Sequence, residues 1–223
     1  MHTKFSKSQL KSKFLTTFGA NYLISMGVIK RQGLKNTIAT YIGFGIGFLN
    51  LIVIQPHFLS KEELGLTRVL YSFSLLVAMF VPMGIGNATT RFFPLFKNIE
   101  KRHHGYLGFM LLFPLVGFIL AALGLLLFKD AIMARYAAES PMFNTFYFYV
   151  FPMTFAVSFL SVLSIYCSVN FKSTIPTYLN DIVVRIMTIG VVSMYYVKWL
   201  DLDQFIMAFT GIYVVQMLGL LGY

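Results

Sequence analysis

The sequence predicts an all-α integral membrane protein with six transmembrane helices, and two observations lead to this fold class. Hydrophobic residues make up 57% of the 223 residues and charged residues only 12%, about half the charged fraction of an ordinary soluble domain. The apolar residues also come in long uncharged blocks, whereas a soluble core would scatter them along the chain. The 24 Phe and 13 Tyr exclude intrinsic disorder.

The blocks have the length of membrane-spanning helices. Five of them contain no Asp, Glu, Lys or Arg over 20 to 32 residues, and a sixth is interrupted only by Asp181 and Arg185. As helices they are long enough to cross about 30 Å of hydrocarbon. The residues from Leu111 to Phe128 show no alternation of polar and apolar types, which argues against a β-barrel. The six predicted spans are residues 36–60, 69–90, 105–128, 144–168, 174–197 and 204–223.

The distribution of charge predicts the orientation of these spans. The segment before the first span and the second and fourth loops together carry twelve Lys or Arg and one acidic residue, whereas the other three loops carry five basic and six acidic residues. Basic residues concentrate on the cytoplasmic side of a membrane. We therefore predict that residues 1–35 form a basic cytoplasmic N-terminal segment. We attribute the net charge of +10 to topology and to anionic membrane lipids, and not to nucleic acid.

The fifth span carries a polar stripe inside the membrane. Thr177, Asp181, Arg185 and Thr188 are spaced by 4, 4 and 3 residues, which places them on one helix face. Asp181 precedes Arg185 by one turn, the favourable order for a charge pair. Two interpretations stay open: the pair fixes helix packing, or Arg185 faces a polar cavity and offers donors to a phosphate group.

The first and second spans carry further polar residues. Asn87 and Arg91 are four residues apart and either reach the headgroups or line the inner mouth of a cavity. The same two interpretations apply to Arg68 at the other end of that helix. The first span has small and polar residues on one face, among them a GxxxG pair, and this pattern favours a close packing seam. The residues of that face are Asn36, Thr40, Gly43, Gly47 and Asn50.

The sequence lacks the signatures of catalysis and of metal binding. It has no phosphate loop, nucleophile elbow, HExxH or CxxC motif. The lone Cys167 and the adjacent His103 and His104 make a poor metal site. No second carboxylate accompanies Asp181 in the membrane. We therefore predict a protein that is not an enzyme and that needs neither a cofactor nor a metal.

Three segments resemble a known family. They are the run MGVIKRQGLKNTI at residues 26–38, the join PHFLSKEELG at residues 56–65, and GNATTRFF at residues 86–93, where the second span ends. Together they resemble the start of bacterial polysaccharide (O-antigen) flippases, also called lipopolysaccharide biosynthesis proteins. These belong to the multidrug/oligosaccharidyl-lipid/polysaccharide exporter superfamily. The resemblance covers roughly residues 26 to 223.

The resemblance carries expectations about architecture and function. Such flippases have two pseudo-symmetric six-helix lobes, so residues 36–223 correspond to the N-terminal lobe of a chain truncated at its C-terminus, and residues 1–25 to an extension. The implied function is to move a polyprenyl-diphosphate-linked glycan from the cytoplasmic to the outer leaflet of the bacterial inner membrane. The implied partners are this lipid-linked glycan, membrane lipids and polysaccharide-assembly proteins.

Physical chemistry, and not the family pattern, selects the candidate binding residues. A diphosphate inside a helix bundle needs cations, and a glycan needs hydrogen-bonding side chains. The candidates are therefore Arg185, Arg91, Arg68, Asn50, Asn87 and Asn180, together with Asp181. Two alternatives stay open: a drug or cation antiporter of the same superfamily that uses Asp181 for ion coupling, and a membrane scaffold that transports nothing.

Overall fold

The computed structural model describes residues 32–96, 105–136 and 140–222. Every regular element in these ranges is a helix, which confirms the predicted all-α fold. Most of the predicted N-terminal segment, as well as His103 and His104, lies outside the described residues. Five helical segments are long and apolar enough to cross a membrane. They are Gln32–Phe58, Tyr106–Leu127, Pro141–Val169, Thr174–Tyr196 and Leu202–Leu221.

The ends of these five segments agree with the predicted spans to within a few residues, because charged residues interrupt the apolar runs there. The first segment contains a π-helical stretch, η1 (Leu49–Ile54), and ends in α2 (Gln55–Phe58). The second is α5 (Tyr106–Leu127), followed by the short α6 (Lys129–Tyr136). The remaining elements are α7 (Pro141–Phe146), η3 (Tyr147–Tyr149), α8 (Val150–Val169), α9 (Thr174–Tyr178), η4 (Leu179–Val183), α10 (Val184–Tyr196) and α11 (Leu202–Leu221).

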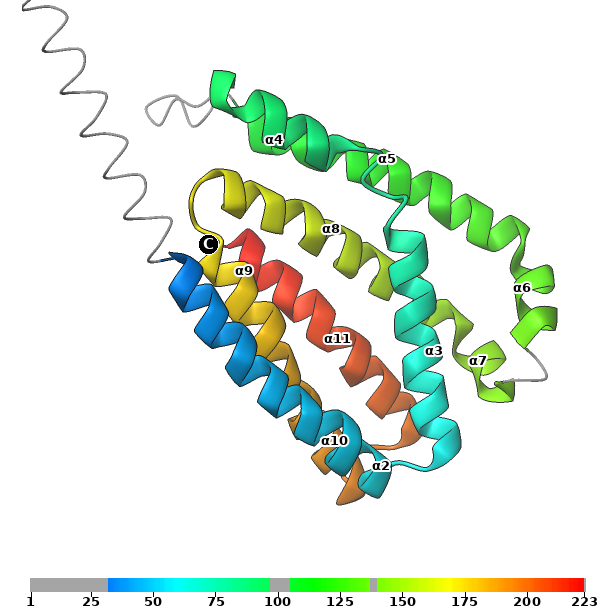
Figure 1. The fold of residues 1–223 in the computed structure, drawn as a ribbon. Helices are drawn as coiled ribbons and strands as arrows, with labels where there is room; N and C mark the ends of the chain where they lie inside the picture. Colours follow the sequence, from blue (N-terminus) through cyan, green and yellow to red (C-terminus); the bar gives the residue numbers. More distant parts are fainter. Residues whose placement is uncertain (1–31, 97–104, 137–139, 223) are drawn as a thin grey trace, which may run out of the picture.

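The predicted span at residues 69–90 is not one continuous helix, so the count of six spans is not confirmed. Instead α3 (Lys61–Ala78) and α4 (Ile85–Phe96) are separated by a bend at residues 79–84 (Figure 1). Pro82 has no N–H to continue the helix, and Met83 and Gly84 have left-handed φ angles of 47° and 80°. Pro82 and Gly84 together break the helix.

Helix α3 begins earlier than predicted because a capping box extends it toward the preceding loop. The Ser60 hydroxyl accepts a hydrogen bond from the Glu63 N–H, and the Glu63 carboxylate accepts one from the Ser60 N–H. Such reciprocal bonds satisfy the free donors of a first helical turn. The charged residues at the N-terminus of α3 are therefore helical.

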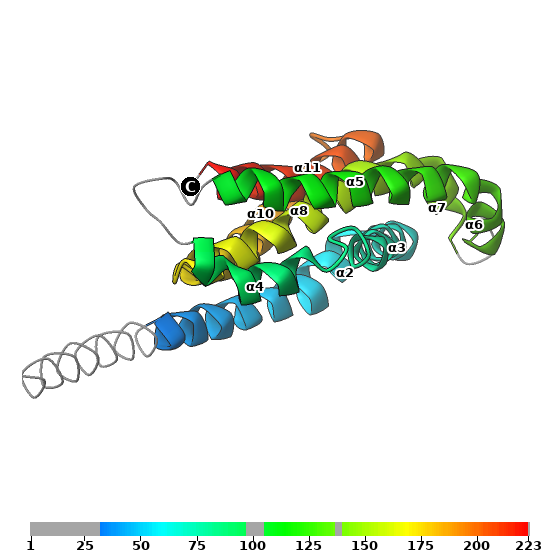
Figure 2. The same cartoon turned by 90° about the horizontal axis from the view of Figure 1, so that it is seen from above.

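Helix α8 is the centre of the bundle. It packs against α3, α4, α5 and α11, and its buried residues occupy most of its circumference. Figure 2 shows the first span, α3 and α4 in one layer and α5 and α11 in another, with α8 between them. The Tyr147 hydroxyl, in η3 directly before this helix, donates to the buried Leu125 carbonyl at 2.8 Å. Helix α8 thus connects the two layers.

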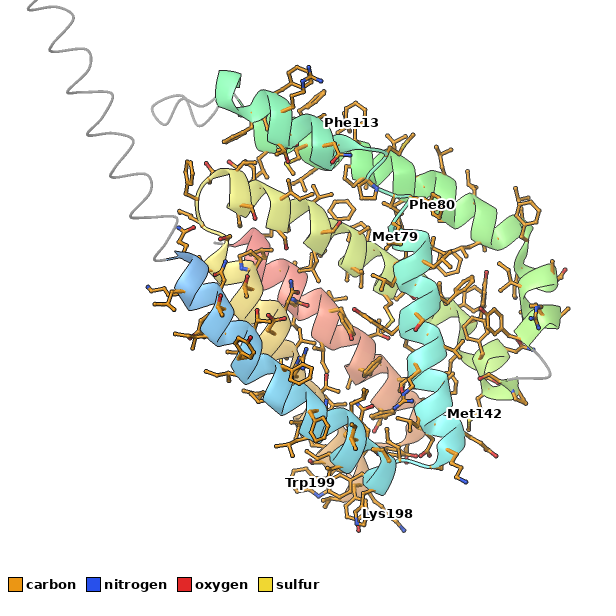
Figure 3. The ribbon with its side chains drawn as sticks, in the orientation of Figure 1. Met79, Phe80, Phe113, Met142, Lys198 and Trp199 are labelled. Atoms are coloured by element: carbon orange, nitrogen blue, oxygen red, sulfur yellow. The ribbon has the colours of Figure 1, made fainter. Side chains whose placement is uncertain are left out.

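Large apolar side chains cover the outside of the bundle, as expected for contact with lipid. Met79 and Phe80, at the bend between α3 and α4, are 76% and 74% exposed (Figure 3). Trp199 lies with Lys198 in the turn after α10 and is 73% exposed. Tryptophan beside a basic residue is typical of a membrane–water interface.

We predict that Gly117→Ala destabilises the fold, because α5 passes close to the bend. A Cβ at position 117 would overlap the Val81 carbonyl oxygen, which is backbone and cannot rotate away. We expect a loss of about 1–3 kcal/mol in the free energy of unfolding. The measurement is a melting curve in detergent that follows the reaction of a fluorogenic dye with the buried thiol of Cys167.

Gly124→Ala is the matched control in the same helix. A Cβ there has open space around it, and alanine favours helix by about 1 kcal/mol over glycine. Equal melting temperatures for the two variants would contradict the close approach of α5 to Val81.

Candidate functional site

The first and fifth spans form a close seam at the GxxxG pair. A Cβ at position 43 would overlap the backbone of Asp181, and a Cβ at position 47 would overlap the guanidinium of Arg185. Position 43 therefore requires glycine for the two helices to approach this far, and glycine at position 47 leaves room for the Arg185 side chain. The predicted packing seam is confirmed, and its partner is the polar stripe of the fifth span.

Hydrogen bonds continue along the seam toward the start of the first span. The Thr40 hydroxyl donates to the Asp181 carboxylate at 2.8 Å. One turn earlier, the Asn36 amide donates to the Ser173 hydroxyl at 3.1 Å. The Arg185 guanidinium donates to the Gly43 carbonyl. These three bonds pair polar groups of one span with polar groups of the other, which removes them from contact with lipid.

Asp181 and Arg185 do not form the charge pair that their spacing suggested. Both residues are described, and each side chain bonds to the first span and not to the other. The reason lies in η4, where the fifth span widens into a π-helix around Asp181. A π-turn bonds residues five apart, so the i,i+4 relation of a regular α-helix does not hold across it.

A cavity of about 860 Å³ lies beside this seam. The first span, α3, α8, the fifth span and α11 surround it, and both π-helical stretches contribute to its wall. Its wall mixes apolar side chains with amides, hydroxyls and charged groups. The polar residues that line it are Asn50, Gln55, Thr67, Arg68, Tyr71, Ser161, Ser164, Asn180, Asp181, Arg185, Thr188, Tyr213 and Gln216.

The cavity brings together five of the seven predicted binding residues. Arg185 and Asp181 enter from the seam, and Arg68 enters from α3 with its side chain exposed. Asn180 accepts a hydrogen bond from Gln216 of α11. Asn50 is only 6% exposed, and its amide oxygen has no hydrogen-bond partner among the described residues.

Asn87 and Arg91 lie outside this cavity. Both are exposed on α4, and the Arg91 guanidinium lies over the neighbouring Phe92 ring at 5.7 Å. They lie on α4, whereas Arg68 lies on α3, before the bend at residues 79–84. The structure therefore places them apart from the other five candidates.

Several residues of the cavity wall were not predicted from the sequence. Gln55 and Gln216 are buried in the cavity wall, but each stands alone in an apolar run, so no stripe pointed to them. Tyr71 and Tyr213 stack on each other with ring centroids 5.2 Å apart. From the sequence alone, a tyrosine in an apolar helix can equally be a core residue. Only tertiary packing identifies these two as cavity residues.

The cavity is tied together at the end near α2. The Tyr195 hydroxyl of α10 donates to the Glu63 carboxylate of α3. Phe58 of α2 and Tyr196 of α10 stack with centroids 4.4 Å apart. These contacts hold the first span, α3 and α10 together at this end. Away from this end the first span and α3 diverge from each other (Figure 1).

The chemistry of the cavity is that of binding a polar or anionic group. Within the described ranges, no three His, Cys, Asp or Glu side chains come close enough to hold a metal ion. Guanidinium groups donate in pairs to phosphate oxygens, and the amides of Asn50 and Gln55 suit hydroxyl groups. A ligand that combines both kinds of group matches this wall.

We predict that Thr40 and Asp181 are energetically coupled across the seam. Thr40→Val and Asp181→Leu should each change the free energy of unfolding. The double variant should depart from their sum by about 0.5–2 kcal/mol, the range for hydrogen bonds between membrane helices. Unfolding titrations in mixed micelles measure all three values. Thr37→Val is the control, because its hydroxyl donates within its own helix to the Gly33 carbonyl, and additive behaviour of Thr40 and Asp181 would contradict the seam.

Comparison with protein-family models, with curated proteins and with solved structures finds no match to this chain. The function is therefore inferred from the cavity and from the sequence.

Proposed function

We propose that this protein is a membrane transporter that moves a lipid-linked oligosaccharide, a polyprenyl diphosphate carrying a glycan, from the cytoplasmic to the outer leaflet. The observation that carries the proposal is a cavity inside an apolar helix bundle whose wall contains Arg68 and Arg185. Charged side chains at membrane depth are costly, and they mark substrate pathways.

The parts of such a lipid correspond to different parts of the molecule. The diphosphate needs cations, and Arg68 and Arg185 supply them from two different helices. The glycan hydroxyls need donors and acceptors, which the amides of Asn50, Gln55 and Gln216 provide. The polyprenyl chain needs an apolar surface, and large apolar side chains cover the outside of the helices.

The setting of this proposal is the bacterial inner membrane, with the N-terminus in the cytoplasm. The charge distribution of the loops supports this orientation. In the same proposal the chain forms the N-terminal lobe of a flippase of the polysaccharide-exporter type. The cavity wall that the described helices leave open then faces the second lobe, and the two lobes alternate access to the lipid.

A second candidate is an ion-coupled drug or cation antiporter, which one observation favours. Asp181 bonds to Thr40 and not to Arg185, so its carboxylate is not neutralised by a guanidinium. A membrane carboxylate of this kind can exchange a proton or bind a cation.

We predict that Arg185→Ala and Arg68→Ala each lower transfer of a fluorescent polyprenyl-diphosphate glycan across proteoliposome membranes at least tenfold. The loss follows because a hydrogen bond between charged groups contributes about 1.5–3 kcal/mol. Arg91→Ala is the matched control, since this arginine is exposed on α4 and away from the cavity. Unchanged transfer in both cavity variants, or an equal loss in Arg91→Ala, would contradict the proposal.

The antiporter candidate makes a different prediction for Asp181→Asn. Removal of the titratable carboxylate should abolish substrate efflux driven by a proton or sodium gradient, because the coupling ion loses its site. The measurement is gradient-driven efflux of a cationic dye from proteoliposomes. Persistent transfer of the lipid-linked glycan in this variant, without any gradient-driven efflux in the wild type, would favour the flippase.

A further inference from the structure

The two glycines of the seam meet different parts of the fifth span. At position 43 an added Cβ would meet the backbone and Cβ of Asp181, so this glycine lets the two helix backbones approach each other. At position 47 the three atoms nearest to an added Cβ would all belong to the side chain of Arg185, namely its Nη1, Cζ and Nε atoms. Gly47 therefore leaves room for a guanidinium and not for a helix.

The Arg185 side chain occupies this notch. Its Nη1 donates to the Gly43 carbonyl one turn away from Gly47. Arg185 also lines the cavity and is only half-buried. The guanidinium is thus held at the cavity wall by a backbone acceptor, which costs little to leave when a stronger, anionic acceptor arrives.

An unused acceptor lies in the cavity on the same helix. Asn50 follows Gly47 by three residues, so it stands about one turn further along. Its side chain is 6% exposed and its amide oxygen accepts no hydrogen bond among the described residues. A buried acceptor without a donor is unfavourable, and it points to a donor that enters this part of the cavity.

We propose that the notch formed by Gly43 and Gly47 is a resting position for the Arg185 guanidinium. From this notch the guanidinium turns into the cavity, toward the amide oxygen of Asn50, when a polyprenyl diphosphate binds. Gly47 is then a positioning residue, since it determines where the cation rests. This inference depends on the proposed function, because it assumes an anionic ligand in the cavity. While Arg185 rests in the notch, the apparent affinity for the diphosphate is lowered by the fraction of molecules that are not ready to bind it.

The test is the affinity of Gly47→Ala for polyprenyl diphosphate in lipid nanodiscs. The added methyl group closes the notch and keeps the guanidinium in the cavity. We expect binding to be about tenfold tighter, the equivalent of one lost hydrogen bond from a charged donor. Gly45→Ala is the matched control on the same helix, because a Cβ there has open space around it, and its affinity should be that of the wild type.

A double variant separates a moved arginine from damaged packing. In an Arg185→Ala background, Gly47→Ala should have no further effect on affinity, because the side chain that it displaces is gone. A gain that persists in this background, or no gain in Gly47→Ala although Arg185→Ala weakens binding, would overturn the resting position. An unchanged affinity in Arg185→Ala alone would instead overturn the proposed function of the cavity.

A measurement on the wild type covers the case in which Gly47→Ala does not fold. The arginine Nε–H resonance that Arg185→Lys removes belongs to Arg185, and polyprenyl diphosphate should shift this resonance as the guanidinium leaves the Gly43 carbonyl. A shift of the Arg68 resonance alone, with that of Arg185 unchanged at saturation, would overturn the inference.

Discussion

The contact between the polar stripes of the first and fifth spans is the constraint on which the rest of the structure depends. Neither stripe is tolerable against lipid, because a bilayer offers no partner to a hydroxyl, a carboxylate or a guanidinium. Each stripe satisfies the other through Thr40 with Asp181 and through Arg185 with Gly43. Glycine at positions 43 and 47 makes this contact short enough. Polar side chains that take no part in the seam then face the cavity beside it.

The seam also explains how two charged groups coexist in the membrane without pairing. A direct bond between Asp181 and Arg185 would have neutralised both and left a purely structural pair. The π-helical η4 separates them, and the first span supplies a different partner to each. The guanidinium therefore keeps donors for a ligand. A second π-helical stretch, η1, lies in the adjoining wall, on the first span, with Asn50, and π-turns of this kind are common at functional sites.

Composition and spacing predicted a large part of this arrangement. The apolar runs gave five of the spans, since charge is excluded from the bilayer core and its return marks the helix ends. The spacing of Asn36, Thr40 and Gly43 predicted one packing face, which is where the fifth span lies. The sequence does not show which faces of different helices pack against each other. Spacing along the chain therefore predicted a pair between Arg185 and Asp181. It did not point to Gln216, because its partner Asn180 is on another helix.

The predicted second span fails for a related reason. Pro82 and Gly84 are visible in the sequence, yet whether they kink a helix or end it depends on the packing around them. Helix α5 passes so close to Val81 that only Gly117 fits there, and the turn at residues 79–84 sets α4 apart from α3. Arg91 consequently lies on α4 and Arg68 on α3, two helices that this turn separates.

A water-accessible cavity lies inside the bundle beside the seam, and thiol accessibility tests its presence most directly. In a Cys167→Ala background, Ser161→Cys places a thiol on the cavity wall, whereas Leu112→Cys places one on the exposed apolar side of α5. A charged, membrane-impermeant methanethiosulfonate reagent should modify the cysteine at position 161 rapidly and the one at position 112 hardly at all, and polyprenyl diphosphate should protect position 161. Equal rates at the two positions, or no reaction at position 161, would contradict the cavity.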